Sequence, residues 1–373
     1  MSPYIIIGAL TAGLAFLGAN RKLEKAAFAV SFIILLLFLV FRYGQGTDWL
    51  AYNYIFQGAP SSINFESVFY TDAYHSEIGW KLLNNIIKVF GFDFVAISVL
   101  SSVIEMFLLA RFINRFSPNR ALSLLVAFPV VYLTYFFSAM RQGLVISLFL
   151  GLMVEWLQKG ETVKYLFVTM LAITIHSLSV VLLIPLAVSK FSFKSLGTVL
   201  ALFGAAGTFM IPIMPSLTSL LASSYSGNSI SVVALGYRIT TAALIYFMYT
   251  SAKKQESTDD LEILIKVYLS GLAIYLLLMG NDLLASRLAS PLLAVDIALI
   301  PILVKRGSGK LIAPLMLALL LLIAVMSAKN IDSYIEQGDY YGNINILNYP
   351  YISIFNQNEI ANYTNSKYLI YLK

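Results

Sequence analysis

The sequence predicts an all-α polytopic membrane protein, and its composition is the first reason. Of its 373 residues, 59% are apolar and 12% are charged, and the mean hydropathy is +0.80. The charged fraction is about half of that in an ordinary soluble domain. A soluble fold of this length also needs a polar exterior. The composition therefore excludes an ordinary soluble enzyme, a disordered chain and a nucleic-acid-binding domain.

The second reason is the division of the chain into about twelve apolar segments, judged against the ~20 residues that a membrane-crossing helix needs. The predicted segments are residues 3–19, 24–41, 92–113, 121–140, 142–158, 163–176, 177–189, 196–221, 232–251, 261–280, 288–304 and 311–328. The two segments beside His176 are short. They are predicted as two half-membrane helices or as one bent helix with a re-entrant turn. No internal repeat is evident, so residues 1–373 are predicted to form a single integral membrane domain.

The third reason is the distribution of basic residues, which also orients the chain. Alternate short loops hold fifteen of the 25 lysines and arginines: Arg21, Lys22, Lys25, Arg111, Arg115, Arg120, Lys159, Lys164, Lys190, Lys194, Lys253, Lys254, Lys305, Arg306 and Lys310. The positive-inside rule makes this side cytoplasmic and places both termini outside. The pI of 9.2 has the same origin and does not indicate nucleic acid.

Three segments are expected on the outer side: a long loop at 42–91, a short loop at 222–231 and a polar tail at about 330–373. The long loop contains an amphipathic stretch at 77–88. We expect this stretch to lie along the membrane surface, with Trp80 at the level of the headgroups. The first apolar stretch lacks a basic region and a small-residue cleavage site, so no cleavable signal peptide is predicted.

Most basic residues are expected in the cytoplasmic loops, but a few ionisable residues lie singly in apolar surroundings on the outer side. They are Arg42, Asp48, Glu77, Arg141, His176, Arg238, Asp282 and Arg287. At 1.5 Å per helical residue, the four arginines and His176 lie ~18–27 Å from a cytoplasmic-edge lysine or arginine of their own helix. That distance places them in the outer third of a ~30 Å hydrocarbon core. Because ionisable groups at this depth usually line a cavity, we expect one shared cavity that opens outward.

The residue types suggest the chemistry of that cavity. Arginine offers a planar fork of donors that suits phosphate oxygens, so the pocket fits a lipid-linked phosphate or pyrophosphate. Asp48, His176 and Glu77 are candidate general bases for a hydroxyl group. Simpler explanations stay open: an arginine that snorkels to headgroups, a histidine in helix packing, or an acidic residue at a helix N-terminus.

Other features restrict the mechanism. The chain has no cysteine and only two histidines, His75 and His176, which excludes disulfides and histidine-rich metal centres. No metal and no cofactor are therefore expected. Nucleotide-binding and hydrolase motifs are absent, so energy must come from an activated substrate or a gradient. Glu105 and Asp296 lie deeper in the spans, with no role predicted beyond helix packing or a polar path.

The outer charges carry a resemblance to a known family. The run from Phe41 to Trp49 resembles the R-x-G-x-G-x-D-Y segment that follows the second span of the EpsG family, which is similar to Wzy-type polysaccharide polymerases. Further matches follow in the same order: Tyr52, Glu77-Ile-Gly-Trp80, Met140-Arg-Gln-Gly143, His176-Ser177, Tyr237-Arg-Ile239 and Ser286-Arg-Leu288. Trp49 stands where tyrosine is commoner. The tail carries no part of the resemblance.

The resemblance implies a GT-C-like membrane glycosyltransferase in the bacterial inner membrane. Such enzymes join undecaprenyl-pyrophosphate-linked oligosaccharides at the outer face, with the lipid pyrophosphate as leaving group. Arg141, Arg238 and Arg287 would bind the pyrophosphate, and Arg42 would join them or organise Asp48. Asp48 and His176 rank equally as the base, ahead of Glu77. Trp49, Tyr52 and Trp80 would contact sugar. A flippase and a chain-length regulator of the same pathway are expected partners.

Two alternatives stay open. A ligase would move a finished glycan from the same lipid donor to another acceptor, with the same arginines and a different acceptor site. A transporter of lipid-linked oligosaccharides should place polar groups near the midplane and show paired repeats with broken helices. The outer-level charges and the lack of repeats favour the enzyme.

Overall fold

The computed structural model describes residues 1–63, 69–70, 76–210, 230–252, 259–307, 312–338, 340 and 342–364. Within these residues the chain forms helices and two isolated antiparallel bridges, and it contains no strand of a sheet. The all-α prediction is therefore confirmed. Some predicted features lie outside the described residues: residues 222–229 of the predicted loop at 222–231, residues 211–221 of the predicted segment 196–221, and His75, Lys253, Lys254 and Lys310.

The helices of the N-terminal half follow the apolar segments closely. They are α1 (Pro3–Leu17), α2 (Glu24–Val40), α6 (Phe94–Phe116), α7 (Arg120–Ala127), the π-helix η1 (Phe128–Phe136), α8 (Met140–Leu148), the π-helix η2 (Phe149–Met153) and α9 (Val154–Lys159). The long loop after α2 contains two more helices, α3 (Trp49–Gly58) and α5 (Ile78–Val89). The second of these is the amphipathic stretch that the sequence predicts.

The second half continues the same pattern. Its helices are α10 (Thr162–Ile175), the 3-10 helix η3 (Ser177–Leu183), α11 (Ile184–Val188), α12 (Phe193–Met210), α14 (Val232–Ala252), α15 (Asp259–Leu278), α16 (Asp282–Leu293), α17 (Asp296–Arg306), α18 (Ile312–Gln337) and the short η5 (Gln357–Asn362). The chain leaves helical geometry at His176, whose φ of −153° and ψ of 113° are extended. The segments beside His176 are therefore two short helical pieces.

Five helices of the described chain are long and apolar enough to cross a membrane: Phe94–Phe116, Met140–Lys159, Val232–Ser251, Asp260–Leu278 and Ile312–Gln337. A sixth is added if α16 and α17, bent by 52° at their junction, form one span. These helices fit a multi-pass membrane protein. Large apolar side chains such as Phe16, Phe107 and Phe167 are exposed, as expected for contact with lipid. The count of about twelve membrane segments stays a prediction.

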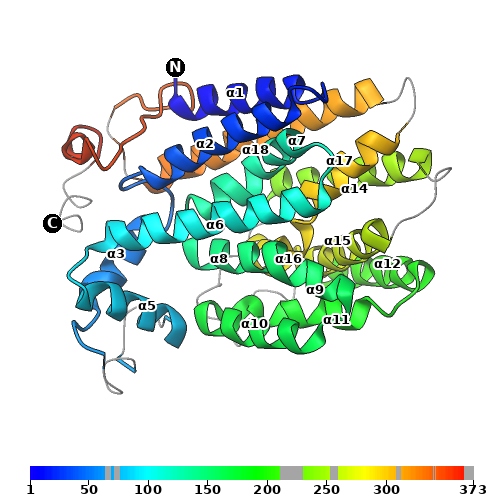
Figure 1. Ribbon diagram of the computed structural model, residues 1–373, viewed down its shortest axis with the longest axis horizontal. Helices are drawn as coiled ribbons and strands as arrows, with labels where there is room; N and C mark the ends of the chain where they lie inside the picture. The colour runs from blue at the N-terminus through cyan, green and yellow to red at the C-terminus, as the bar shows by residue number, and fades with distance from the viewer. Residues whose placement is uncertain are drawn as a thin grey trace.

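The helices lie side by side in a bundle with two distinct ends (Figure 1). The N-terminus, α3, α5 and the tail at 342–364 lie at one end. The loops from α1 to α2, from α6 to α7 and from α9 to α10 lie at the other end. The two terminal segments touch, because the N–H of Ser2 donates to the carbonyl of Leu347 (2.6 Å).

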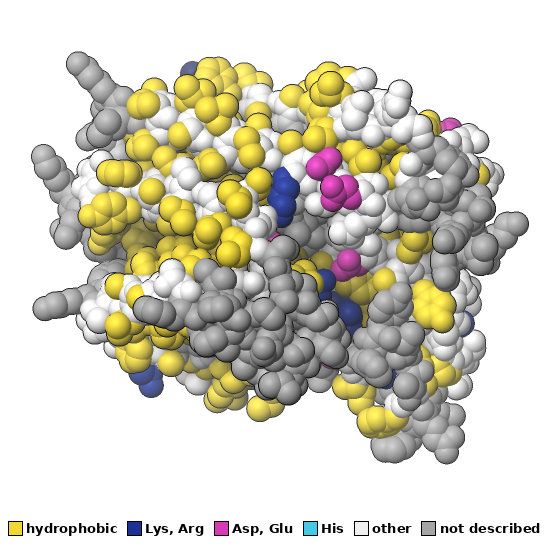
Figure 2. Space-filling model, turned by 180° about the vertical axis from the view of Figure 1, so that it is seen from behind, with side chains coloured by type: hydrophobic (Ala, Val, Ile, Leu, Met, Phe, Trp, Pro, Cys, Tyr) yellow, Lys and Arg dark blue, Asp and Glu magenta, His cyan; other side chains and the backbone are white. Residues whose placement is uncertain are grey.

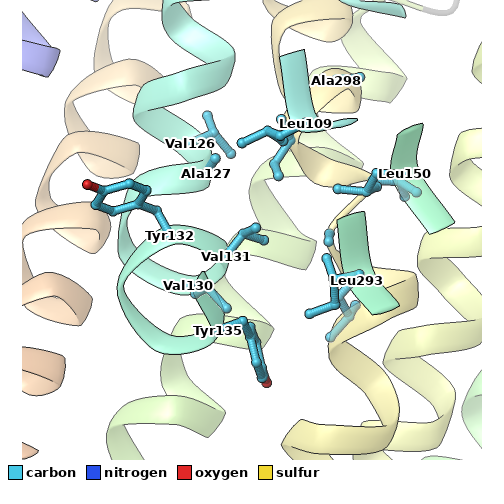
Figure 3. Packing of buried hydrophobic residues seen from close by; sticks show 14 of the residues in the cluster. Leu109, Val126, Ala127, Val130, Val131, Tyr132, Tyr135, Leu150, Leu293 and Ala298 are labelled. Carbon is cyan, nitrogen blue, oxygen red and sulfur yellow. The ribbon is translucent and has the colours of Figure 1, made fainter. Parts of the chain in front are cut away.

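The centre of the bundle is the continuous pair α7 and η1. Its apolar side chains are buried, with α1, α2 and α17 packed against α7 and with α8 and α18 packed against η1. Figure 3 shows part of this core, including Val126, Val131 and Leu293. Burial of a large apolar side chain stabilises a fold by about 1.5–3 kcal/mol in water. In a bilayer, close packing of this kind holds helices together.

Two side chains join α18 to η1. The Asn330 amide donates to the carbonyl of Pro129, and the Tyr334 hydroxyl donates to the carbonyl of Leu133. Buried backbone carbonyls need such partners. The contacts fix the C-terminal turns of α18 beside η1.

Candidate functional site

A cavity of about 200 Å³ lies where the start of α3, the end of η1, α14, α16 and α18 meet. Its lining includes five charged residues: Asp48, Arg238, Asp282, Arg287 and Lys329. Four of these are outer charges singled out from the sequence, and they come from three separate stretches of chain. On the face seen in Figure 2, apolar side chains prevail, and a few acidic and basic side chains gather near the middle.

Asp48 and Arg287 face each other across the cavity. Arg287 Nη2 lies 3.8 Å from Asp48 Oδ2, and the two side chains are 25% and 29% exposed. Asp48 occupies the N-cap position of α3, yet its carboxylate caps no backbone N–H. It accepts a hydrogen bond from Thr47 Oγ1 instead (2.9 Å). Capping therefore does not explain this carboxylate, which stays available to a ligand.

Arg238 reaches the cavity from α14 and is held by a polar network. Its Nη2 donates to Ser290 Oγ (3.0 Å), which also accepts from the Tyr135 hydroxyl (2.6 Å). A second, small cavity of about 10 Å³ is lined by both Arg238 and the buried Asp296. Asp296 thus lies buried behind Arg238, on the wall of the same small cavity. From the sequence, Asp296 had no predicted role beyond helix packing or a polar path, and the structure places it beside Arg238.

Lys329 is the cavity residue that sequence reasoning missed. The predicted last segment ended at residue 328, whereas α18 continues to Gln337. Lys329 lies 17 residues after Ile312, or ~26 Å along the helix at 1.5 Å per residue. The same arithmetic gives the arginines a similar distance along their helices. The sequence signal that could have identified Lys329 is its position as a single lysine at the end of a long apolar run.

A second charged cluster forms around Glu77 at the start of α5. The carboxylate accepts from Arg141 Nη1 (2.5 Å), from the Ser177 N–H (2.8 Å) and from Ser177 Oγ (3.0 Å). His176 Nδ1 lies 3.5 Å from the same carboxylate. Three segments that are distant in sequence are therefore joined through one side chain.

This cluster adjoins the cavity without lining it. Arg141 lies over the Tyr52 ring, with its guanidinium carbon 5.5 Å from the ring centre. The next residue on α8, Gln142, donates through Nε2 to the backbone carbonyl of Arg287 (2.6 Å). The α8 N-terminus thereby ties the Glu77 cluster to the helix that carries Arg287.

Arg42 takes a different position. It is 1% exposed and donates to the Leu39 carbonyl (2.7 Å), to Ser102 Oγ (2.8 Å) and to the Phe136 carbonyl (3.0 Å). It is not among the residues that line the cavity. Its hydrogen bonds fix the chain where α2 ends, so this placement gives no support to a role in binding pyrophosphate.

With this geometry established, the comparison with known families is informative. The family model described as the EpsG family matches residues 25–353, which is most of the chain. The chain belongs to the EpsG family. EpsG proteins are Wzy-type polysaccharide polymerases, so the resemblance seen in the outer motifs is confirmed. No curated protein and no solved structure matches the chain.

The aromatic residues expected to contact sugar are buried in this EpsG protein. Trp49, Tyr52 and Trp80 pack in one apolar cluster together with Phe56 and Phe94. They are not among the residues that line the cavity. Their contact with sugar stays a prediction, and their observed contribution is to pack α3 and α5 against the bundle.

The surroundings of Glu77 in this EpsG protein affect its suitability as a general base. Burial raises the pKa of Glu77, but the neighbouring His176, the charge of Arg141 and the N–H of Ser177 together outweigh burial and lower this pKa to about 2. A general base works best with a pKa near the working pH. Glu77 is thus suited to hold Arg141 and the His176–Ser177 segment in place rather than to accept a proton.

The low pKa of Glu77 predicts a pH-dependent stability difference. Its folded pKa of about 2 is below the ordinary 4.5, so the ionised group stabilises the fold above pH 4.5, and that stabilisation disappears as the pH falls toward 2. After solvent screening, Glu77→Gln is expected to cost about 1–2 kcal/mol at pH 7. Thermal unfolding of the detergent-purified protein at pH 7 and pH 3 measures this. The exposed Glu359→Gln is the control, and a gap that stays constant with pH would contradict the prediction.

Two arginines and one lysine around one cavity make a site for a multiply charged anion, with two carboxylates beside it. Preorganised cations stabilise negative charge that develops on a leaving group. In the described part of this EpsG protein, no group of three or more histidine, aspartate or glutamate side chains is placed to hold a metal ion. The charged residues of the cavity can bind an anion, and a carboxylate beside them can accept a proton.

Proposed function

We propose that the protein polymerises undecaprenyl-pyrophosphate-linked oligosaccharide repeat units at the outer face of the bacterial inner membrane, as a GT-C-like glycosyltransferase. The observation that carries this proposal is the single cavity in which Arg238, Arg287 and Lys329 meet Asp48. Membership of the EpsG family supports the polymerase class. The cavity supports an anionic, phosphate-bearing substrate, because arginine and lysine suit phosphate oxygens.

The proposed orientation places both termini and the cavity outside. It is supported by the shared end of the bundle, where the N-terminus, α3 and the tail lie together, with the basic loops at the opposite end (Figure 1). Under this proposal the apolar segments, about twelve in number, cross or enter the membrane. The product would be an O-antigen, capsular polysaccharide or exopolysaccharide. A flippase would supply the substrate, and a chain-length regulator would limit the polymer.

In the proposed reaction, a hydroxyl of the incoming repeat unit attacks the anomeric carbon of the growing chain. A new glycosidic C–O bond forms, while the C–O bond to pyrophosphate breaks and the leaving group keeps its electron pair. Asp48 accepts the hydroxyl proton, because it is the candidate base that lines the cavity. Arg238, Arg287 and Lys329 stabilise the departing pyrophosphate. An in-line displacement of this kind inverts the anomeric centre.

Reconstitution with a purified lipid-linked repeat unit tests the function. The protein in detergent or nanodiscs, with no second compartment, should produce a ladder of polymer lengths. Transfer only to lipid A core or to a protein acceptor would identify a ligase instead. Movement of the substrate across liposomes without a ladder would identify a transporter.

Lys329→Ala is expected to lower kcat/KM for the lipid-linked donor by about 10–100-fold, because one of three cations around the leaving group is lost. Lys329→Arg should recover most of the activity, since the positive charge returns. The exposed Lys305→Ala, at the opposite end of the bundle, is the matched control and should behave as wild type. Equal kinetics for Lys329→Ala and wild type would remove Lys329 from the site.

A further inference from the structure

The tail at 342–364 is joined to the loop that leads into Asp48. The N–H of Tyr43 donates to the carbonyl of Ile352, and the N–H of Ile354 donates to the carbonyl of Phe41, each at 2.9 Å. These two bonds flank an antiparallel bridge between Arg42 and Ser353. Residues 352–354 thus pair with residues 41–43 as a short two-stranded contact.

Gln45 strengthens this junction. It is fully buried, accepts a hydrogen bond from the Tyr4 hydroxyl (2.9 Å) and donates through Nε2 to the Pro350 carbonyl (2.7 Å). One side chain therefore joins the first helix, the loop and the tail. Its neighbours Gly44 and Gly46 have φ values of 64° and 96°, which glycine adopts at little cost.

Buried side chains anchor the tail as well. The Tyr351 ring stacks on Phe38, with centres 4.2 Å apart, and its hydroxyl donates to the Phe38 carbonyl (2.9 Å). Tyr349 and Ile352 are fully buried. A Cβ added at Gly44 would collide with Ile360, so the tail closes tightly over this glycine. These contacts show that the tail packs closely against α2 and the loop that follows it.

The loop then delivers Asp48 to the cavity within three residues of Gln45. The N–H of Thr47 donates to Ser138 Oγ (3.1 Å), and Asp48 follows at the start of α3. We propose that Gln45 and tail residues 350–354 are positioning elements that hold the Asp48 loop in its working geometry, as a fixed clamp that stays closed during turnover. This inference rests on the proposed function only through the role of Asp48.

The first test replaces Gln45 with methionine, which keeps the length of the side chain and loses both hydrogen bonds. We expect kcat to fall at least tenfold, while KM for the lipid-linked donor changes less than about threefold, because the three cations of the cavity lie on other helices. Gln57→Met, an exposed glutamine of α3, is the matched control with wild-type kinetics. Hydrogen exchange on the full chain should show faster exchange at residues 43–48 in Gln45→Met alone.

The second test uses the absence of cysteine from the chain. Tyr43 and Ile352 are opposite residues of the antiparallel contact, where Cα atoms lie about 5.5 Å apart, within the range of a disulfide. In the double variant Tyr43→Cys/Ile352→Cys, a fixed clamp predicts equal or higher polymerase activity in the oxidised form than in the reduced form. Activity that is lost on oxidation and restored on reduction would show that the tail must move, and would overturn the inference.

The two proposals fail separately. If wild-type protein makes no polymer, the proposed function is wrong. The hydrogen-exchange comparison then still tests the clamp, and equal exchange at residues 43–48 in Gln45→Met and wild type would overturn it. If wild type makes polymer and Gln45→Met matches its kcat, the positioning role is wrong and the function stands.

Discussion

Replacing Arg287 with alanine is expected to reduce polymer formation by at least about 100-fold, the loss typical when one preorganised donor to a developing negative charge is removed. Arg287 lines the cavity, and its guanidinium lies 3.8 Å from the Asp48 carboxylate, so it can contact the leaving group beside the base. The measurement is kcat/KM with a purified lipid-linked repeat unit, together with polymer length in cells at equal protein level.

Two comparisons sharpen this expectation. Arg287→Lys keeps the charge and loses the planar fork of donors, so it should recover only part of the activity. Arg21→Ala removes an exposed arginine from the loop between α1 and α2, at the opposite end of the bundle from Arg287, and should leave polymer length unchanged. Long-chain polymer at wild-type level in Arg287→Ala, with the protein present, would exclude Arg287 from the reaction.

The sequence predicted the helices well because apolar runs of this length have few other structures open to them. It predicted the end of a helix less well where the helix continues beyond its apolar run. The last segment was ended at residue 328, where polar residues begin, but α18 continues to Gln337. Asn330 and Tyr334 explain the difference, since both bond to carbonyls of η1 and so keep the polar turns helical. Lys329 was missed for this reason.

The sequence gives the position of a residue along its helix, but not the direction in which its side chain points around that helix. Rise per residue placed Arg42, Arg238 and Arg287 at a similar outer level. The structure brings Arg238 and Arg287 to one cavity but buries Arg42 against backbone carbonyls of α2 and η1. Which way a side chain points depends on the neighbours that pack against the helix. Those neighbours come from distant parts of the chain, so the sequence of the helix itself does not indicate them.

The choice of base shows what the structure adds. From the sequence, Asp48 and His176 ranked equally, ahead of Glu77. In the structure Asp48 lines the cavity, whereas Glu77 is held by Arg141 and Ser177 and lies close to His176. The carboxylate of Asp48 is thus the group of the three that a substrate in the cavity can reach. Contact with the substrate is the first requirement for a general base.

Asp48→Asn is therefore expected to lower kcat by about 10²–10⁴-fold, the usual contribution of a general base, with little change in KM. The substitution keeps the size of the side chain, and Asp48 caps no backbone N–H, so α3 should stay folded. Single-turnover kinetics with the lipid-linked substrate separate the chemical step from binding, and Glu77→Gln should show a smaller loss of kcat. If Asp48→Asn keeps its rate while His176→Gln loses it, the proton acceptor is His176, and the cavity serves for binding the leaving group alone.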